Sequence, residues 1–189
     1  MNATTRFRGF ADPVLDGQAC FRAVLEAMSR PGRVQRIVPP AECPPGLSPA
    51  AAAVLLTLVD GDTRLRLGAG AEALAWVRFH CGCPLVADGA DFVLDPTAPL
   101  LSLPAGTEEE PEAGATLILD VAALEAGRGW RLTGPGIRDA HRLHVAGAPA
   151  GFVADWARNR ARHPRGVDVI LCAGDRIAAL PRTTTVEDA

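Results

Sequence analysis

The sequence predicts an α/β fold: a single domain, residues 1–189, with three layers and a mixed central sheet. Helical patterns alternate with strand-like runs along the chain. The apolar run ATLILDV, residues 115–121, is typical of a strand that is covered on both faces by helices. The segment GVDVILCAGDRIAALP, residues 166–181, has two strand-like halves around Gly-Asp, which predicts a hairpin and therefore adds antiparallel pairing.

A helix and a strand are the first expected elements. Asp12-Pro13 predicts a turn, and Asp16 stands where the N-cap of a helix is expected. Apolar residues then recur at helical spacing and predict one buried face, made of Phe21, Val24, Leu25 and Met28. The segment SRPG, residues 29–32, ends this helix, and the alternating residues 33–38 predict the first strand.

The middle of the chain predicts a buried helix followed by short elements. Ser48-Pro49 begins a helix that is apolar almost all round, so it is expected to be buried on several sides, and residues 60–62 end it. Alternation and helical spacing then predict a strand at 63–67, a helix at 71–80 and short strands at 84–87 and 91–95. The irregular segment 96–111 predicts a surface loop with one helical turn.

Beyond the central apolar run, residues 129–133 alternate and predict a strand. A Gly-Pro-Gly turn follows, and the stretch after it is one in which a helix could begin. Residues 149–162 predict the last helix, with apolar and arginine side chains on opposite faces, namely Val153, Trp156 and Ala157 against Arg158, Arg160 and Arg162.

Composition excludes several classes of function. The net charge of −3 makes the chain as a whole a poor match for nucleic acid. All 19 basic residues are arginine, and without lysine the chain can form neither a Schiff base with pyridoxal phosphate nor a P-loop clamp. The longest apolar run, residues 50–59, is too short for a membrane span. Five cysteines, with no apparent leader peptide, predict reduced thiols and a cytoplasmic location.

The segment HCGC offers the densest cluster of possible metal ligands, with His80, Cys81 and Cys83. A metal site would need further ligands from other elements, such as Cys43, Cys172 or the pair His141 and His144. We expect instead that the thiols pack in the core and that no metal is bound. The sequence contains no Gly-x-Ser-x-Gly elbow and no cysteine-protease signature, so no catalytic residue is assigned.

The segment TGPG, residues 133–136, contains the Pro-Gly pair that a type II turn places at its second and third positions, here Pro135 and Gly136. Glycines also let an anion approach the backbone, as at the start of a helix. Both interpretations are open at this stage, and chain reversal is the favoured one.

Six segments in the same order resemble the PhnH family of the bacterial carbon–phosphorus lyase system, over about residues 9–187. They are GFADPVLDGQACFRAVLEAMSRPGRV, VLLTLVDGDT, RFHCGCPLV, PEAGATLILDV, RLTGPGI and HPRGVDVILCAGDRIAALPRTTTVE. The resemblance implies a fold similar to the large domain of pyridoxal-phosphate transferases, but without that cofactor. Cys81 and Cys83 are departures from the family pattern, which further weakens the metal interpretation.

The resemblance also implies a role in phosphonate catabolism. Proteins of this family form homodimers and work in the cytoplasm with the G, I and J subunits of the core complex. That complex makes ribose 1-methylphosphonate 5-triphosphate from a nucleoside triphosphate such as ATP and a phosphonate. We therefore expect an assembly subunit that binds neither nucleic acid nor membrane and carries no cofactor of its own.

No catalytic residue is transferred by the resemblance. The segments SRPG, TGPGI and PRTT are expected to shape a shared surface or cleft, and their candidate ligand- or partner-binding residues are Arg30, Gly134, Gly136, Arg182, Thr183 and Thr184. The alternative is a stand-alone protein that binds a phosphonate or nucleotide through the Gly134-Pro135-Gly136 turn with Arg138 or Arg182.

Overall fold

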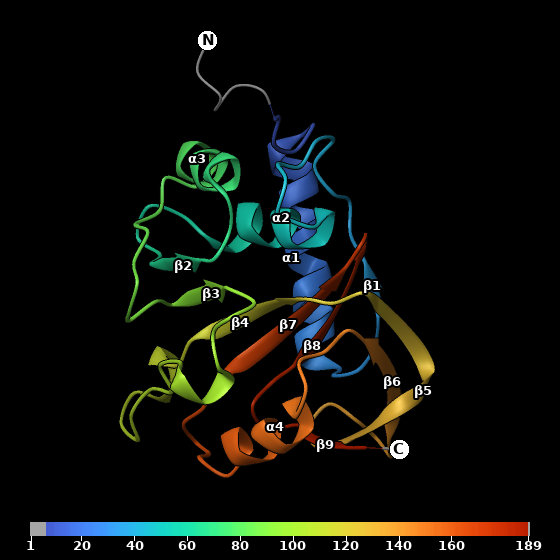
Figure 1. The fold of residues 1–189 in the computed structure, drawn as a ribbon. Helices are drawn as coiled ribbons and strands as arrows, with labels where there is room; N and C mark the ends of the chain where they lie inside the picture. The colour runs from blue at the N-terminus through green and yellow to red at the C-terminus, as the bar shows by residue number, and fades with distance from the viewer. Residues whose placement is uncertain (1–6, 189) are drawn as a thin grey trace.

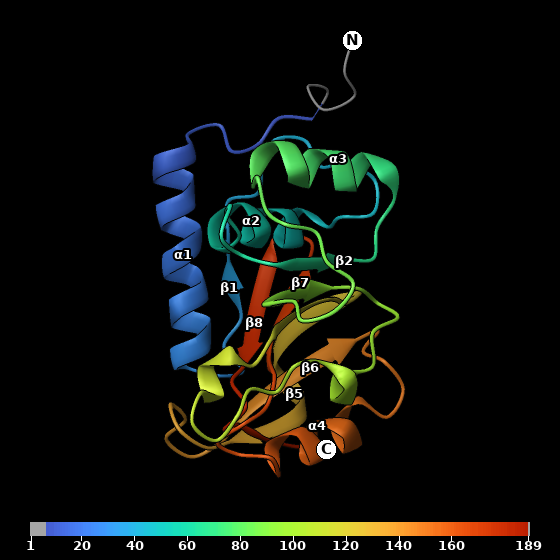
Figure 2. The same cartoon turned by 90° about the vertical axis from the view of Figure 1, so that its left-hand side faces the viewer.

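Two β-sheets and four α-helices make up the computed structural model, which describes residues 7–188 (Figures 1 and 2). The helices are α1 (Pro13–Ser29), α2 (Pro49–Leu58), α3 (Ala71–His80) and α4 (Phe152–Arg160), with short 3-10 turns η2 (Leu100–Ser102) and η3 (Pro111–Ala113). The strands are β1 (Gln35–Arg36), β2 (Leu65–Leu67), β3 (Phe92–Leu94), β4 (Thr116–Asp120), β5 (Ala123–Thr133), β6 (His141–Ala146), β7 (Asp168–Ala173), β8 (Arg176–Leu180) and β9 (Thr185–Glu187).

The six-stranded central sheet has the order β1-β8-β7-β4-β3-β2. Strands β2, β3, β4 and β7 are parallel to one another, whereas β8 returns antiparallel to β7 and β1 pairs antiparallel to β8. The predicted α/β class with a mixed sheet is therefore confirmed. The predicted hairpin at the end of the chain is also confirmed, and it supplies the antiparallel part of the sheet.

Both faces of the central strands are buried, as the continuous apolar run in β4 predicts. On one face Ile118 and Ile170 belong to a core that includes α1, α2 and α3. On the other face Leu117 and Leu119 pack in a second core with the three-stranded sheet β6-β5-β9 and α4. The expectation of helices on both faces is therefore only partly correct for this second face, because α4 shares it with a long hairpin formed by residues 123–146.

Helix α1 begins earlier than predicted, and its N-cap is Asp12 rather than Asp16. The Asp12 carboxylate accepts hydrogen bonds from the backbone N–H groups of Val14 and Leu15, at 3.1 and 3.0 Å. Asp16 instead accepts a hydrogen bond from the Asp12 backbone N–H at 3.0 Å. The two carboxylates together therefore accept from backbone N–H groups at the start of the helix that have no partner within it. Pro13 fits the first helical position because its missing N–H has no partner there in any helix.

Several other predictions are confirmed and two are corrected. Helices α2 and α3 begin and end close to their predicted bounds, and Ser48 caps α2 by accepting a hydrogen bond from the Ala51 backbone. Residues 84–87 form no strand and contribute only an isolated bridge at Leu85. The stretch after the Gly-Pro-Gly turn is strand β6, not the start of a helix. None of the helices in residues 7–188 is long and apolar enough to cross a membrane.

Candidate functional site

The Gly-Pro-Gly turn joins β5 to β6 and reverses the chain. The Ile137 backbone N–H donates to the Gly134 carbonyl at 3.1 Å, which closes a four-residue turn around Pro135 and Gly136. Gly136 has a φ of +79°, the conformation that the third position of a type II turn requires. The interpretation as a chain reversal is thus confirmed, and because β6 follows, no helix start is present here to hold an anion.

The turn also brings the three predicted segments together. A Cβ atom on Gly136 would collide with the carbonyl oxygen of Ser29 at the end of α1. A Cβ atom on Gly134 would lie 3.1 Å from the carbonyl oxygen of Thr183. TGPGI therefore packs on both SRPG and PRTT through close backbone contacts. That these three segments form a shared binding surface stays a prediction.

Arg182 is held inside the molecule. Its side chain is 13% exposed, and it donates to both carboxylate oxygens of Asp168, with the shortest distance 2.6 Å, and to the carbonyl oxygen of Pro111 at 2.5 Å. Thr184 is buried, and its backbone carbonyl accepts from the indole N–H of Trp156 at 2.9 Å. These contacts connect β7, η3, α4 and the segment before β9, so Arg182 and Thr184 already have structural roles.

Arg30 lies at the exposed end of α1, where its guanidinium donates to the Glu26 carboxylate at 2.5 Å. Arg33, two residues beyond Pro31, lies 3.9 Å from the same carboxylate oxygen and makes no shorter ion pair within residues 7–188. Glu26 is thus engaged mainly by Arg30, and the guanidinium of Arg33 is left largely unpaired.

A groove of about 390 Å³ opens beside Arg33, between the end of α1 and the β5–β6 hairpin. It is lined by Gly32, Arg33, Val34, Gln35, Ala126, Gly127, Ala140, His141 and Arg142. The Nδ1 atom of His141 lies 2.7 Å from the carbonyl oxygen of Pro31, so this nitrogen carries the proton and donates. A Cβ atom on Gly32 would collide with Leu132, and glycine at this position lets the end of α1 pack directly on β5.

Sequence reasoning did not assign this groove. His141 was considered only as a metal ligand, and Arg33 and Arg142 were not singled out. The available signal was Gly127-Arg128-Gly129 at the start of the predicted strand 129–133, because glycines within a strand indicate a bulge and β5 does extend across them.

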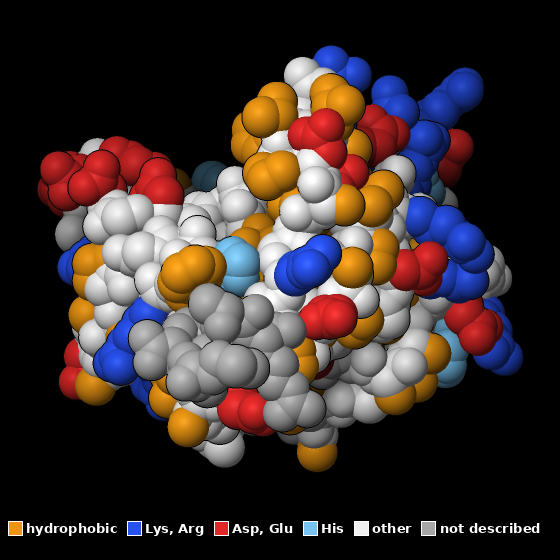
Figure 3. Space-filling view, turned by 90° about the horizontal axis from the view of Figure 1, so that it is seen from above, with side chains coloured by type: hydrophobic (Ala, Val, Ile, Leu, Met, Phe, Trp, Pro, Cys, Tyr) orange, Lys and Arg blue, Asp and Glu red, His pale blue; other side chains and the backbone are white. Residues whose placement is uncertain are grey.

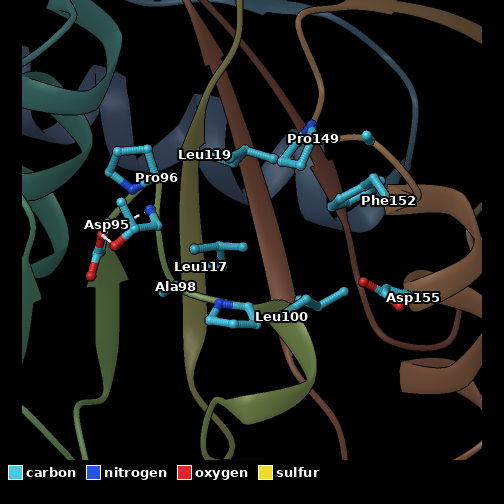
Figure 4. A pocket seen from close by; sticks show the side chains of 12 residues that line it. Asp95, Pro96, Ala98, Leu100, Leu117, Leu119, Pro149, Phe152 and Asp155 are labelled. Atoms are coloured by element: carbon cyan, nitrogen blue, oxygen red, sulfur yellow. Dashed lines mark hydrogen bonds between the residues drawn. The ribbon is translucent and has the colours of Figure 1, made fainter.

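A second cavity, of about 230 Å³, lies where β3 and β4 end, beside α4 (Figure 4). Proline, leucine and phenylalanine side chains form most of its wall, and Asp95 and Asp155 approach it from opposite sides. The carboxyl ends of parallel strands are the usual place for a ligand in α/β folds. However, none of the described residues that line this cavity is basic, so its charge does not suit a phosphonate or a triphosphate.

Asp95 is 9% exposed and fully engaged by its neighbours. It accepts from the backbone N–H and the hydroxyl of Thr97, at 2.9 and 2.7 Å, and from the guanidinium of Arg66 at 2.7 Å. The Thr97 hydroxyl above all, with the Thr97 backbone and Arg66, lowers the pKa of Asp95 below its usual value. Asp95 therefore fixes the loop after β3 and offers little to a ligand.

Cys81 and Cys83 follow α3 and are both buried in the first core. Burial, with a smaller contribution from Cys83, raises the pKa of the Cys81 thiol to about 12, so this sulfur is a poor nucleophile at neutral pH. Within residues 7–188, no three histidine, cysteine or acidic side chains are placed to hold a metal ion. The packing of both thiols in the core agrees with the expected role.

The outer face of α1 is the most apolar exposed surface that we identify. The predicted buried face is correct for Val24, but Phe21 and Leu25 point away from the core. Together with Val14 and Leu15 they are 44 to 76% exposed. Helix α1 lies at the edge of the molecule in Figure 2, and hydrophobic side chains gather on the ridge at the top of Figure 3, beside acidic and basic ones.

Comparison with known proteins identifies relatives along nearly the whole chain. The chain is 38% identical over 188 residues to the alpha-D-ribose 1-methylphosphonate 5-triphosphate synthase subunit PhnH of Rhizobium meliloti (strain 1021), a match that covers 94% of each chain. It is 36% identical over 182 residues to the putative C-P lyase subunit protein HtxG of Stutzerimonas stutzeri, covering 89% of this chain and 85% of the relative.

The match to a protein family has nearly the same extent. Residues 8–187 match the family described as bacterial phosphonate metabolism protein (PhnH). The match agrees closely with the span of about residues 9–187 over which the sequence resembles that family. This chain therefore belongs to the PhnH family.

Proposed function

We propose that this chain is the PhnH subunit of a carbon–phosphorus lyase complex that makes ribose 1-methylphosphonate 5-triphosphate, and that its own contribution is assembly. The match along the chain to a relative named as the subunit of that synthase carries the proposal. The described residues offer polar groups that are mostly engaged with one another, such as Arg182 with Asp168, rather than an exposed nucleophile with a base. Such a chain acts as part of an enzyme.

The partners in this proposal are the G, I and J subunits of the complex. The test is to co-express the tagged full-length chain with these three subunits from the same organism and to purify the complex. We expect all four chains to elute together in constant proportion and the assembled complex to form the triphosphate product. Assembly of G, I and J into an active complex without this chain would contradict the proposal.

The isolated chain is proposed to be a homodimer that uses the exposed face of α1. Charges along the helix support a second copy as the occupant of this face. Asp12 and Asp16 lie at its start, whereas Arg30 and Arg33 follow its end, where they outnumber the single carboxylate of Glu26. An antiparallel pair of α1 helices would place the acidic start of one copy against the basic end of the other and would cover Phe21 and Leu25.

The measurement for the homodimer is the molar mass of the isolated chain in solution. Phe21→Asp is expected to convert a dimer into a monomer because it places a charge in the apolar contact. Phe79→Asp is a matched control, since Phe79 is also exposed, at 60%, but lies on α3. A monomeric unsubstituted chain, or a dimer that survives Phe21→Asp, would contradict this assignment.

No pyridoxal phosphate is assigned to this chain in the proposal, because the sequence has no lysine to hold it as a Schiff base. ATP and the phosphonate are substrates of the complex. The proposed fold likeness to the large domain of pyridoxal-phosphate transferases rests on family resemblance. A cytoplasmic location is proposed as well, and the five thiols, which are unpaired in this structure, fit a reducing compartment.

A further inference from the structure

The groove at the end of α1 combines open space with positive charge. Its described lining contains two arginines, Arg33 and Arg142, and no carboxylate. The guanidinium of Arg142 has no acidic partner within 4 Å among residues 7–188, and Arg33 has only the Glu26 oxygen at 3.9 Å, which Arg30 engages more closely. Two arginines therefore line one cavity, and most of their guanidinium donors have no acceptor among the described residues.

The β5 bulge helps to shape this site. Both Ala126 and Trp130 pair with Leu143 of β6, so the three residues between them have no partner in the ladder. The carbonyl oxygen of Gly129, within the bulge, accepts a hydrogen bond from one terminal nitrogen of Arg142 at 3.4 Å. This contact uses one of the five N–H donors of Arg142 and leaves the others available to a ligand.

His141 adds a third polar group whose orientation is fixed. Because its Nδ1 donates to the Pro31 carbonyl, its other ring nitrogen, Nε2, is the one free to meet a ligand in the groove. Nε2 accepts from a ligand hydroxyl when the ring is neutral, and it donates to an anionic oxygen when both ring nitrogens carry a proton. Nε2 has no hydrogen-bond partner in the described part of the chain. The same contact ties the end of α1 to β6, so two opposite walls of the groove are held together.

We propose that this groove binds an oxyanion of the phosphate or phosphonate class, with Arg33 and Arg142 as its cationic ligands and His141 as a neighbouring hydrogen-bonding group. Arginine presents a planar fork of donors that matches the spacing of two oxygen atoms on such an anion. A volume of about 390 Å³ accommodates more than one phosphoryl group. The choice of this ligand class rests in part on the proposed function, since the substrates of the complex are a phosphonate and a nucleoside triphosphate.

This assignment differs from the stand-alone site considered from the sequence. That hypothesis used the Gly134-Pro135-Gly136 turn with Arg138 or Arg182. Arg182 is already occupied by Asp168 and Pro111, and the turn packs on the end of α1. The cavity beside α4 is lined by two aspartates and has the wrong charge for the same ligand.

Titration calorimetry of the full-length chain, alone and within the purified complex, tests the proposal. Three probes are used: methylphosphonate, tripolyphosphate and ATP. We expect at least one of them to bind with a dissociation constant below about 1 mM at low salt and to weaken as salt is added. Binding of methylphosphonate alone identifies a phosphonate site, whereas equal binding of tripolyphosphate and ATP identifies a site for the phosphate chain.

Four variants assign the binding to the groove. Arg142→Ala and Arg33→Ala are each expected to weaken binding at least tenfold. Arg160→Ala removes one exposed charge from α4 and is expected to change affinity less than twofold. Glu26→Gln is expected to tighten binding two- to threefold, because it removes the one carboxylate that lies within 4 Å of Arg33 among residues 7–188. Partial unfolding cannot produce that gain.

The proposal is overturned if none of the three probes binds at about 10 mM, either to the chain alone or to the complex. It is also overturned if binding is found but Arg33→Ala and Arg142→Ala leave it unchanged. Assembly is measured separately by co-purification. A chain that assembles but binds no anion refutes only the groove, and a chain that binds the anion but does not assemble refutes only the subunit role.

Discussion

Two arginine-containing regions of this molecule differ in how their hydrogen bonds are used. At the end of β8, Arg182 is 13% exposed and is satisfied by Asp168 and Pro111. In the groove beside α1, Arg142 makes one long hydrogen bond to a backbone carbonyl. The difference shows that residue type alone does not distinguish a structural arginine from a binding one. What distinguishes them is whether acceptor groups of the protein itself take up the hydrogen bonds of the guanidinium N–H groups.

Replacing Arg182 should have the largest effect on stability. Arg182→Ala leaves the half-buried carboxylate of Asp168 and the Pro111 carbonyl without their partner, and we expect a loss of about 3 kcal/mol in the free energy of unfolding. Urea denaturation followed by circular dichroism measures this loss. A loss below about 1 kcal/mol would remove the contrast with Arg142 and return Arg182 to the list of possible ligands.

Trp156 tests the same region through a different bond. Trp156→Phe keeps an aromatic ring beside Phe152 but removes the donor to the Thr184 carbonyl. Because Trp156 is fully buried, the carbonyl is left unsatisfied, and a loss of about 2 kcal/mol is expected. The melting temperature and the urea midpoint report it. Phe152→Leu is a suitable companion, since it alters the ring stacking but leaves this hydrogen bond in place.

Asp95 gives a pH-dependent version of the comparison. In the folded chain the pKa of the Asp95 carboxyl is lowered from 3.8, and the largest cause is the hydrogen bond from the Thr97 hydroxyl. Its stabilising contribution is therefore complete above the unfolded pKa and disappears as the pH falls through the folded value. We expect Asp95→Asn to cost about 1 kcal/mol at pH 7 and to reduce the loss of stability between pH 5 and pH 2.5. Parallel pH profiles for the two proteins would contradict this role.

Replacing Arg142 should have the smallest effect on stability. Arg142→Ala removes an exposed side chain that makes only one long hydrogen bond, so the free energy of unfolding should change by less than about 0.5 kcal/mol. The same denaturation measurement checks this. A large loss in the free energy of unfolding would mean that Arg142 supports the β5 bulge. Arg142 would then be a structural arginine like Arg182.

Much of the fold was predictable because it depends on local patterns. The apolar run in β4, the Gly-Asp turn between β7 and β8 and the Ser48 cap each carry their own signal. The exposed Phe21 and Leu25 were assigned to the core because helical periodicity identifies an apolar face but not what covers it. Strand β6 was missed since its pairing with β5 is decided by tertiary contacts rather than by its own sequence.

The candidate site was less predictable for the same reason. SRPG, TGPGI and PRTT lie side by side in the structure, but their side chains are used in different ways, and a common binding role for them stays a prediction. Arg33 and Arg142 are more than 100 positions apart, and only the packing of α1 on the β5–β6 hairpin brings them to one groove. No spacing rule along the chain relates residues at that separation.

The parallel pairing of β4 with β7 has a consequence for biosynthesis. Residues 116 and 117 pair with β3 on one side, but on the other side residues 116–120 find their neighbour in residues 168–172, and β8 follows at 176–180. The middle of the sheet is therefore completed only after residues 168–180 have been translated. Until that segment leaves the ribosome, Ile118 and Leu119 have an unpaired backbone edge beside them. The nascent polypeptide therefore depends on residues 168–180 to become protected from aggregation.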